Sequence, residues 1–381
     1  MSLPLDLVAA PPYDVLSDAD VDVFLARHPR NIVAIDVPRD ADGPDRYHDA
    51  AKRLQAWIAE GTLVRDPQPS FTLYRMRFTD ETGAIRETVG VLGALEVVDE
   101  GADGVLPHER TTPKAKSDRL DLTRATNTNL SPVWGLSLTP GLTELLVEPS
   151  EPMGSCHDEN GVLHTVERVT DPDRVAAIRG AVESNPVLIA DGHHRYAISR
   201  TFRDEQRAAG NAGPAELTLT YVAELVGDQL SIDAIHRLYH GVTSAEVLEV
   251  LAGCFDAHEA GRVQPSFAVD VVTRGSLCLV RPDGSGVWLT PRASAFDGVR
   301  ALDGAYLEHA LAAHDIDVTY QHGVQHVVDI VMSGAASVGV LIRPTSLIEI
   351  RRTADERLLM PPKSTFFTPK LRTGPVLRPL D

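Results

Sequence analysis

The stretch "PVLIADGHHRYAISR", residues 186–200, joins a short apolar run to an Asp-Gly turn, two adjacent histidines and an arginine. The apolar run predicts a buried strand, and the Asp-Gly pair predicts the turn at which a helix begins. The first turn of a helix presents backbone N–H groups and a partial positive charge, and this geometry receives phosphate. Arg195 adds a planar fork for a phosphate, and the histidines add hydrogen bonds or proton transfer near neutral pH.

A purely structural interpretation of the same turn has Asp191 capping the helix, with residues 193–195 solvated in its first turn. Cations at a helix N-terminus are unfavourable unless an anion accompanies them, so three potential cations argue against that interpretation. A metal site is a weaker alternative, because adjacent histidines point about 100° apart and the usual one-face spacing is i, i+4. We therefore predict a phosphate-binding turn made of Asp191, Gly192, His193, His194 and Arg195.

The chain has 381 residues and a formal net charge of −18 at pH 7. Single cores rarely grow beyond about 250–300 residues, so we expect one large or two medium domains. The negative charge argues against a basic face for nucleic acid or for an anionic membrane. Three scattered cysteines fit neither a disulfide framework nor a paired zinc site, which agrees with a cytoplasmic protein. Neither a signal peptide nor a membrane-spanning apolar run is expected.

Helices and strands alternate along the whole chain, which predicts a mixed α/β or α+β fold. The patterns predict helices over 17–28, 46–63 and 171–184, and a hairpin of 70–78 with 87–98 that turns at 80–83. They predict extended segments over 31–38, 131–140, 143–149 and 217–226. We expect a first region over 1–240, a second α/β region over 241–360, and a Pro-rich tail over 361–381 that packs back on the core.

A second polar motif is "PHERTTPKAKSDR", residues 107–119. His108 and Glu109 would begin a zinc-protease motif, but Thr112 stands where that motif needs a second histidine, which excludes it. A His-Glu pair followed by four cations, Arg110, Lys114, Lys116 and Arg119, suits general-base or magnesium chemistry beside phosphates. The alternative is an exposed charged loop.

The C-terminal segment "MPPKSTFFTPK", residues 360–370, resembles the end of a P-loop in its "KST" letters. Prolines replace the glycines of that loop, so no standard phosphate-wrapping loop can form. Lys363 and Lys370 would still reach an anion, and Ser364 and Thr365 are further candidate phosphate contacts. The alternative is a rigid tail whose two phenylalanines pack into the core.

Two shorter motifs are candidate substrate contacts. In "PPYD" a rigid Pro-Pro precedes Tyr13 and Asp14, which would line a pocket or simply pin the N-terminal segment. In "AIHRLYHG" the candidates are His236 and Arg237, as a second anion contact or as the end of a surface helix. No GxGxxG, GxSxG or Walker A motif occurs, so dinucleotide, α/β-hydrolase and P-loop interpretations have no support.

The motifs "APPYDVL", "NIVAIDVP", "PHERT", "ADGHHRYA", "IHRL" and "PPKSTFFTPKLRTG", in this order, resemble a widespread bacterial family of unknown function. Its members are often labelled as similar to the partitioning protein ParB, and the resemblance spans about the whole chain. Residues 192–195 are also similar to the G-x-H-R phosphate motif of sulfiredoxins, and 192–196 to the G-E-R-R-Y motif with which ParB proteins hold CTP. The same superfamily includes free-serine kinases. The resemblance implies a ParB/sulfiredoxin-like nucleotide-binding core with an additional α/β region.

Three departures narrow what the resemblance implies. His193 replaces the ParB glutamate, and no cysteine stands where a sulfiredoxin needs one. The net charge of −18 opposes ParB-like spreading on DNA. Nucleotide binding is the property implied by the resemblance that these departures leave in place.

We therefore predict a Mg²⁺-dependent phosphotransferase that uses ATP or ADP, with CTP as another candidate, and phosphorylates a hydroxyl of L-serine or a similar amino acid. Glu109 would be the base or a metal ligand beside Asp191, His108 and His194 would act in catalysis, and Lys363 would neutralise charge. The alternative is a nucleotide-binding switch without turnover, which needs no acid near the 191–195 turn. The expected partners are a nucleotide and a small hydroxylated substrate, and the oligomeric state stays open, with a homodimer as one option.

Overall fold

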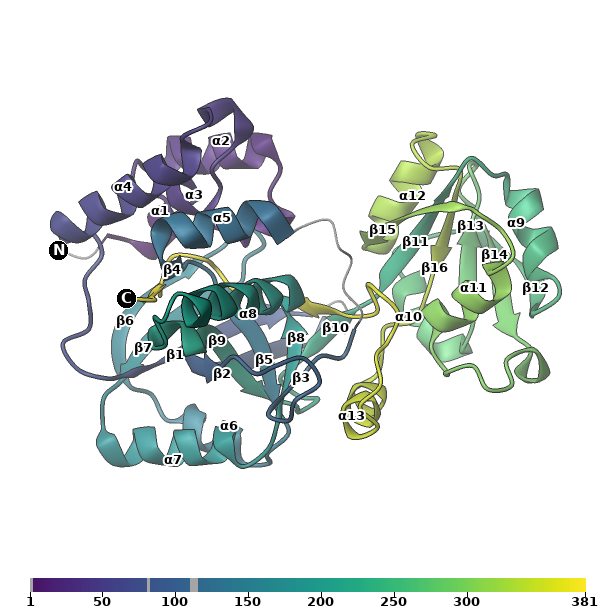
Figure 1. Ribbon diagram of the computed structural model, residues 1–381. Helices are drawn as coiled ribbons and strands as arrows, with labels where there is room; N and C mark the ends of the chain where they lie inside the picture. Colours follow the sequence, from purple (N-terminus) through teal and green to yellow (C-terminus); the bar gives the residue numbers. More distant parts are fainter. Residues whose placement is uncertain (1–2, 81–82, 110–115) are drawn as a thin grey trace. The chain divides into compact units, whose positions relative to one another are not determined.

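The computed structural model describes residues 3–80, 83–109 and 116–381, and it divides the chain into two compact units (Figure 1). Unit 1 comprises Met1–Leu230 and Pro369–Asp381, and unit 2 comprises Ser231–Thr368. Unit 2 is thus inserted in the sequence of unit 1, and the chain returns to unit 1 for its last thirteen residues. Each unit is mixed α/β, as the alternating patterns predicted.

Unit 1 is built on an eight-stranded sheet with the order β3-β8-β5-β9-β2-β1-β7-β6. Its pairs β3/β8 and β5/β9 are parallel and the others are antiparallel. A separate short pair joins β4 to β18. The strands are β1 (Phe71–Thr79), β2 (Ile85–Glu96), β3 (Val105–Leu106), β4 (Thr128–Asn129), β5 (Val133–Ser137), β6 (Glu151–His157), β7 (Leu163–Val169), β8 (Val187–Asp191), β9 (Leu217–Glu224) and β18 (Arg378–Pro379).

The helices of unit 1 form two groups. Buried side chains of α6 and α7 pack against β1, β2 and β9, and Figure 1 shows α8 and α5 on the other side of the sheet. The N-terminal helices enclose a core of their own with Leu122 of α5. The helices are α1 (Leu5–Val8), α2 (Asp18–Arg27), α3 (Val33–Asp36), α4 (Arg46–Ala59), α5 (Lys116–Thr126), α6 (Leu142–Val147), α7 (Pro172–Glu183) and α8 (His193–Ala208), with the 3-10 turn η1 (Tyr13–Val15) before α2.

Unit 2 has an antiparallel six-stranded sheet, β12-β14-β13-β16-β11-β15, between two helical layers. On β13, Leu277 and Leu279 face the core of α9 and α11, whereas Cys278 and Val280 face the core of α10 and α12. The strands are β11 (Ile235–His240), β12 (Phe255–Arg262), β13 (Leu277–Val280), β14 (Ser285–Pro291), β15 (Asp317–His322) and β16 (Val338–Leu341). The helices are α9 (Ser244–Leu251), α10 (Phe267–Arg274), α11 (Asp303–Leu311), α12 (Val324–Met332) and α13 (Leu347–Asp355).

The borders of unit 2 differ from the expected borders at 240 and 360. Strand β11 pairs with β15 and β16 inside the sheet of unit 2, so residues up to 240 cannot all belong to the first region. Strand β10 (Ser231–Asp233) pairs with β17 (Phe366–Thr368), with Ser231 opposite Thr368. The two chain crossings between the units are therefore neighbours, and the returning segment begins at Pro369.

Most local expectations are confirmed, including the helix capped by Ser17 and the hairpin of β1 and β2. Two expected extended segments are wrong. Residues 33–36 form α3, which begins where the Asn31 side chain accepts a hydrogen bond from the Val33 N–H at 3.2 Å. Residues 142–147 form α6, whose first turn donates to the Glu224 carboxylate from Gly141 and Thr143. Short apolar runs suit a buried helix as well as a strand, and the contact that decides comes from a distant residue.

Among the described residues, every helix is too short or too polar to cross a lipid bilayer.

Candidate functional site

The site is built on the turn between β8 and α8, where the expected strand, Asp-Gly turn and helix follow one another. Gly192 has φ +85°, in the left-handed region that favours glycine. A Cβ atom at this position would lie 3.0 Å from Arg195 Nε. Because glycine has no side chain to cap the helix, α8 begins without a side-chain cap and its first N–H groups face the turn.

Asp191 is held by two cations from different parts of unit 1. Its Oδ2 atom accepts from Arg195 Nη2 at 2.5 Å, and its Oδ1 atom accepts from Lys370 Nζ at 2.9 Å. Burial by itself raises the pKa of Asp191, but the charges of Lys370 and Arg195 hold it well below its usual range. The two cations Arg195 and Lys370 therefore share one carboxylate at the N-terminus of α8.

Arg195 connects the turn to the neighbouring strand. Its Nη1 group donates to the Pro132 carbonyl just before β5, and its side chain is only 10% exposed. Burial lowers the pKa of Arg195, and the negative charges of Asp191 and Asp14 more than offset that effect. Among the described residues, Arg195 Nε has no hydrogen-bond partner. The guanidinium is thus fixed in place and keeps its charge.

His108 lies beside the same turn, as the parallel pairing of β3 with β8 requires. Its Nδ1–H group donates to the Ile189 carbonyl, which leaves Nε2 as the unprotonated nitrogen of the neutral ring. The rings of His108 and His193 lie 4.8 Å apart, centroid to centroid. Burial lowers the pKa of His108 to about 4. The pKa of His193 lies well below its usual range; burial is the largest cause, and the charge of His108 is the second.

Both of these histidines are therefore neutral at pH 7, which corrects the count of three potential cations in the first turn. Arg195 and Lys370 supply the charge, and His193 supplies a polar surface. Its Nε2 atom is buried and has no hydrogen-bond partner within the described part of the chain. His194 is half-buried as the second residue of α8.

Glu109 follows His108 directly, and Val105 and Leu106 pair in parallel with Val187 and Leu188. The backbone of Glu109 thus continues along the carboxyl end of β8, where Asp191 lies. Arg110 and Lys114 fall outside the described residues.

The N-terminal motif reaches the Arg195 side of the turn. Tyr13 begins η1, and the Arg119 guanidinium lies 3.9 Å above its ring. Burial raises the pKa of Tyr13, whereas the charges of Arg195 and Arg119 lower it. Arg119 in turn donates to the buried Asp36. Tyr13 and Asp14 thus lie on the Arg195 side of the turn, together with Arg119, one of the cations that follow the His-Glu pair in the sequence.

The C-terminal segment of unit 1 carries Lys370 to the turn from 179 residues away. Ala10 and Thr373 exchange backbone hydrogen bonds, and the Arg372 N–H donates to the Tyr74 hydroxyl at 3.1 Å. The Arg372 side chain pairs with Glu159 at 2.9 Å. Of the two lysines expected to reach an anion, Lys370 is the one that lies at Asp191.

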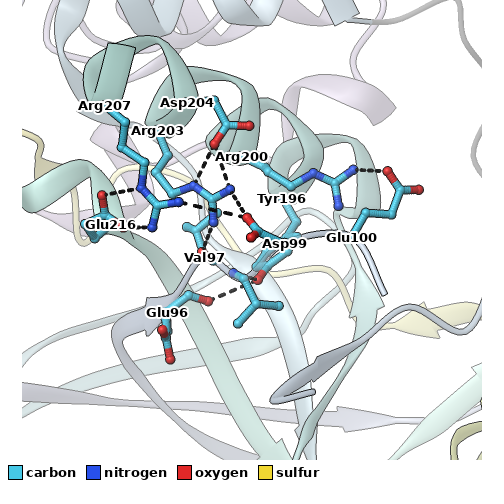
Figure 2. A network of polar contacts seen from close by, with 11 residues as sticks. Glu96, Val97, Asp99, Glu100, Tyr196, Arg200, Arg203, Asp204, Arg207 and Glu216 are labelled. Carbon is cyan, nitrogen blue, oxygen red and sulfur yellow. Dashed lines mark hydrogen bonds and ion pairs between the residues drawn. The ribbon is translucent and has the colours of Figure 1, made fainter. Parts of the chain in front are cut away.

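Hydrogen bonds and ion pairs connect α8 to the chain at the end of β2 (Figure 2). The Tyr196 hydroxyl donates to the Glu96 carbonyl at 3.0 Å and accepts from the Val98 N–H at 2.8 Å. The Arg203 side chain is 2% exposed, donates to the Val97 carbonyl and pairs with Asp99 at 2.5 Å. These contacts set where the N-terminus of α8 lies.

The remaining predicted residues belong to unit 2. The Lys363 carbonyl accepts from Arg237 Nη1 at 3.2 Å, and the Ser364 hydroxyl donates to the Pro361 carbonyl at 2.7 Å. His236 and Arg237 lie on the buried strand β11, so their interpretation as the end of a surface helix is wrong. Burial lowers the pKa of His236 to about 3. Thr365 follows Ser364 directly before β17, in the same unit.

Among the described residues, no three His, Cys, Asp or Glu side chains are arranged to hold a metal ion. Both carboxylate oxygens of Asp191 already accept from cations. A magnesium ion usually binds through one or two carboxylates together with phosphates and waters, so the absence of a cage is compatible with an ion that arrives on a nucleotide.

Residues 2–305 match the family described as a protein of unknown function (DUF1015). The chain belongs to this family. None of the curated proteins matches the chain. The family membership confirms the expected resemblance to a family of unknown function and carries no activity with it.

Solved structures with some likeness are remote. A mutant free serine kinase in complex with AMP is 14% identical, with a TM-score of 0.40, over 73% of this chain and 87% of that one. SbnI with a C-terminal truncation, from Staphylococcus aureus, is 13% identical, with a TM-score of 0.41, over 76% and 87%. A conserved hypothetical protein from Pyrococcus furiosus is 13% identical, with a TM-score of 0.39, over 75% and 95%.

Proposed function

We propose that this protein is a nucleotide-dependent kinase that transfers a phosphoryl group to the hydroxyl of a small acceptor, with L-serine or a similar amino acid as the first candidate. The observation that carries the proposal is the start of α8, which has no side-chain cap and lies between Arg195 and Lys370. Adenine nucleotides are the first candidates for the phosphoryl donor, and CTP is the next.

Phosphate binding follows from the charge and the donors at this turn. The first N–H groups of α8 and the partial positive charge of its N-terminus attract an anion. Arg195 and Lys370 bring two guanidinium or ammonium groups to this turn, and the buried Nε2 atom of His193 provides a hydrogen-bonding group for a phosphate oxygen. A phosphate at this turn would also satisfy helix N–H groups that no side chain caps.

Glu109 and the histidines are the proposed residues for phosphoryl transfer to the acceptor hydroxyl. Phosphoryl transfer depends mainly on positioning and on electrostatic stabilisation of the transferring group. Glu109 would accept the proton of the acceptor hydroxyl or bind the Mg²⁺ that accompanies the nucleotide, where the ion would neutralise phosphate charge. His108 is neutral and acts as a positioning residue, because its ring contacts His193. His194 would contact the transferring group.

The second candidate function is a nucleotide-binding switch without turnover. Asp191 is already paired with two cations, and the described residues contain no preformed metal cage, which favours binding without chemistry. The two functions differ in whether Glu109 takes part in a reaction.

The test incubates the protein with Mg-ATP or Mg-ADP and a panel of hydroxylated amino acids, and follows phosphorylated products by mass spectrometry. The kinase predicts one preferred acceptor and a loss of about 100-fold or more in Glu109→Gln, with nucleotide affinity within a few-fold of the wild type. Glu100→Gln is the matched control, because Glu100 is exposed and pairs with Arg200, which lies farther along α8 than Arg195. Nucleotide binding with no product from any acceptor would support the switch and contradict the kinase.

A further inference from the structure

A small cavity of about 40 Å³ lies between α5, β4 and the first turns of α8 in unit 1. Residues two positions apart in a helix are separated by about 200° around its axis, so Arg195 lies on the side opposite His193. The cavity is on the Arg195 side. Its walls are formed by Arg119, Leu122, Thr123, Thr128, Asn129, Leu130, Ser131, Arg195, Ile198, Ser199 and Thr218.

The polar lining is rich in hydrogen-bond donors and contains no carboxylate. Several hydroxyls are already used, because Thr123 donates to the Arg119 carbonyl and Ser199 bonds with Thr218. Asn129 Oδ1 accepts from the Leu219 N–H at 3.0 Å, so the amide NH₂ group remains as a donor. Within the described part of the chain, the Asn129 NH₂ group and the Ser131 hydroxyl make no hydrogen bond to protein.

Two guanidinium groups reach the cavity. Arg119 and Arg195 come from two helices and each pairs with one carboxylate outside the lining, Asp36 and Asp191. The Nε–H group of Arg195 is buried without a partner among the described residues, so it remains as a donor for an anion. The Arg195 side chain is nine-tenths buried, so its charge acts in a poorly hydrated environment. The volume suits one or two water molecules or a single carboxylate group, and it is too small for a nucleotide base or a sugar.

We propose that this cavity is a carboxylate subsite that binds the carboxylate of the acceptor, separate from the phosphate-binding turn. The assignment of its ligand to an acceptor rests on the proposed kinase function. Arg195 borders both subsites, so a bound carboxylate would place the rest of a small acceptor next to the N-terminus of α8. Acceptors would therefore be small hydroxylated acids, and neutral alcohols would be excluded.

The test uses acetate as the probe and acetamide as its neutral isostere, with saturation-transfer NMR on the full chain. We expect acetate to bind with millimolar affinity and acetamide at least tenfold more weakly. Ser131→Val, which removes a hydroxyl and fills the cavity, should weaken acetate at least fivefold. Ser131→Ala, which leaves the space open, should weaken it less, and Thr201→Val on the exposed face of α8 should leave it unchanged.

The same titration in saturating ADP separates the two proposals. Acetate affinity within threefold of its ADP-free value supports two distinct subsites. Displacement of acetate by ADP, equal binding of acetate and acetamide, or an unchanged affinity in a folded Ser131→Val variant would overturn the carboxylate subsite. Failure of the wild type to bind ADP would contradict the proposed kinase, and the acetate comparison would still decide the cavity.

Discussion

Gly192 is the residue that lets Asp191 and Arg195 meet across the start of α8. Its backbone is left-handed, and its Cα surface is covered by the Arg195 guanidinium. A side chain at this position meets two obstacles at once: the cost of the left-handed conformation and a contact with a buried cation. The proposed phosphate site therefore depends on a glycine at position 192.

The first prediction is that Gly192→Ala destabilises the fold by about 1–2 kcal/mol and weakens ADP binding at least tenfold, because Arg195 is displaced. Chemical denaturation and calorimetry measure the two effects. Gly180→Ala is the matched control, since Gly180 lies inside α7 with open space where the alanine methyl group would lie, and alanine favours a helix. If the Gly192→Ala variant binds ADP as tightly as the wild type, the position of the Arg195 side chain does not matter for ADP binding.

The second prediction concerns the buried neutral histidine. Burial lowers the pKa of His108 from an ordinary value of 6.5 to about 4. Between pH 6.5 and about 4, His108 is therefore protonated in the unfolded chain and neutral in the folded chain. The free energy of unfolding falls as the pH is lowered through this range. At pH 5 this one group should cost about 1–2 kcal/mol of the stability present at pH 7.

His108→Asn keeps an N–H donor for the Ile189 carbonyl and removes the titration. Its stability should fall less between pH 7 and pH 5 than that of the wild type, by the same ~1–2 kcal/mol, in urea denaturation at each pH. His236 acts equally in both proteins and cancels in the difference, whereas His193 keeps burial, the largest cause of its lowered pKa, and loses the smaller contribution of His108. Parallel pH profiles of the two proteins would contradict the assignment of a lowered pKa to His108.

At the scale of elements, α8 is held by side chains spread from Tyr196 in its first turn to Arg203 near its middle. Tyr196 and Arg203 bond to the backbone that follows β2, so the helix start is delivered to the end of β8 without a cap of its own (Figure 2).

The third prediction compares two arginines of this helix. Arg203→Met should cost about 1–3 kcal/mol of stability, because the Val97 carbonyl loses a charged donor while packing is largely kept. Arg200→Met should cost less than about 0.5 kcal/mol, because its partner Glu100 is 86% exposed. Thermal or urea denaturation measures both, and equal costs would mean that the Arg203 network does not fasten the helix.

The sequence predicted the elements that carry a local signal and missed those decided by distant contacts. Ser17 marks α2, alternating patterns mark β1 and β2, and the Asp-Gly turn marks the start of α8. Residues 143–149 looked extended, since nothing nearby reveals that the Glu224 carboxylate caps α6. Lys370 was one of two equivalent lysines in the sequence, and only the docking of the last thirteen residues distinguishes it.

At the scale of the molecule, the proposed phosphate-binding turn, the cavity and Lys370 all belong to unit 1, whereas Lys363 belongs to unit 2. Ser231 lies opposite Thr368, so the ends of the insertion are adjacent and a short linker can replace it. The fourth prediction is that residues 1–230 joined to 369–381 by a Gly-Ser linker fold and bind ADP within tenfold of the full chain. Circular dichroism and calorimetry test this.

Any loss of affinity in the shortened chain measures what unit 2 contributes to ADP binding. If the shortened chain folds but does not bind ADP, this result would contradict a nucleotide site at the α8 turn.

The most direct test of the central claim is a calorimetric titration of ADP into the wild type, Arg195→Gln and Arg200→Gln. Both arginines lie on α8, but only Arg195 borders the turn and pairs with Asp191. We predict ADP binding in the wild type, a loss of affinity of at least tenfold in Arg195→Gln, and no change in Arg200→Gln. Absence of ADP binding in the wild type, or equal affinities in folded forms of all three proteins, would contradict a phosphate-binding site at the start of α8.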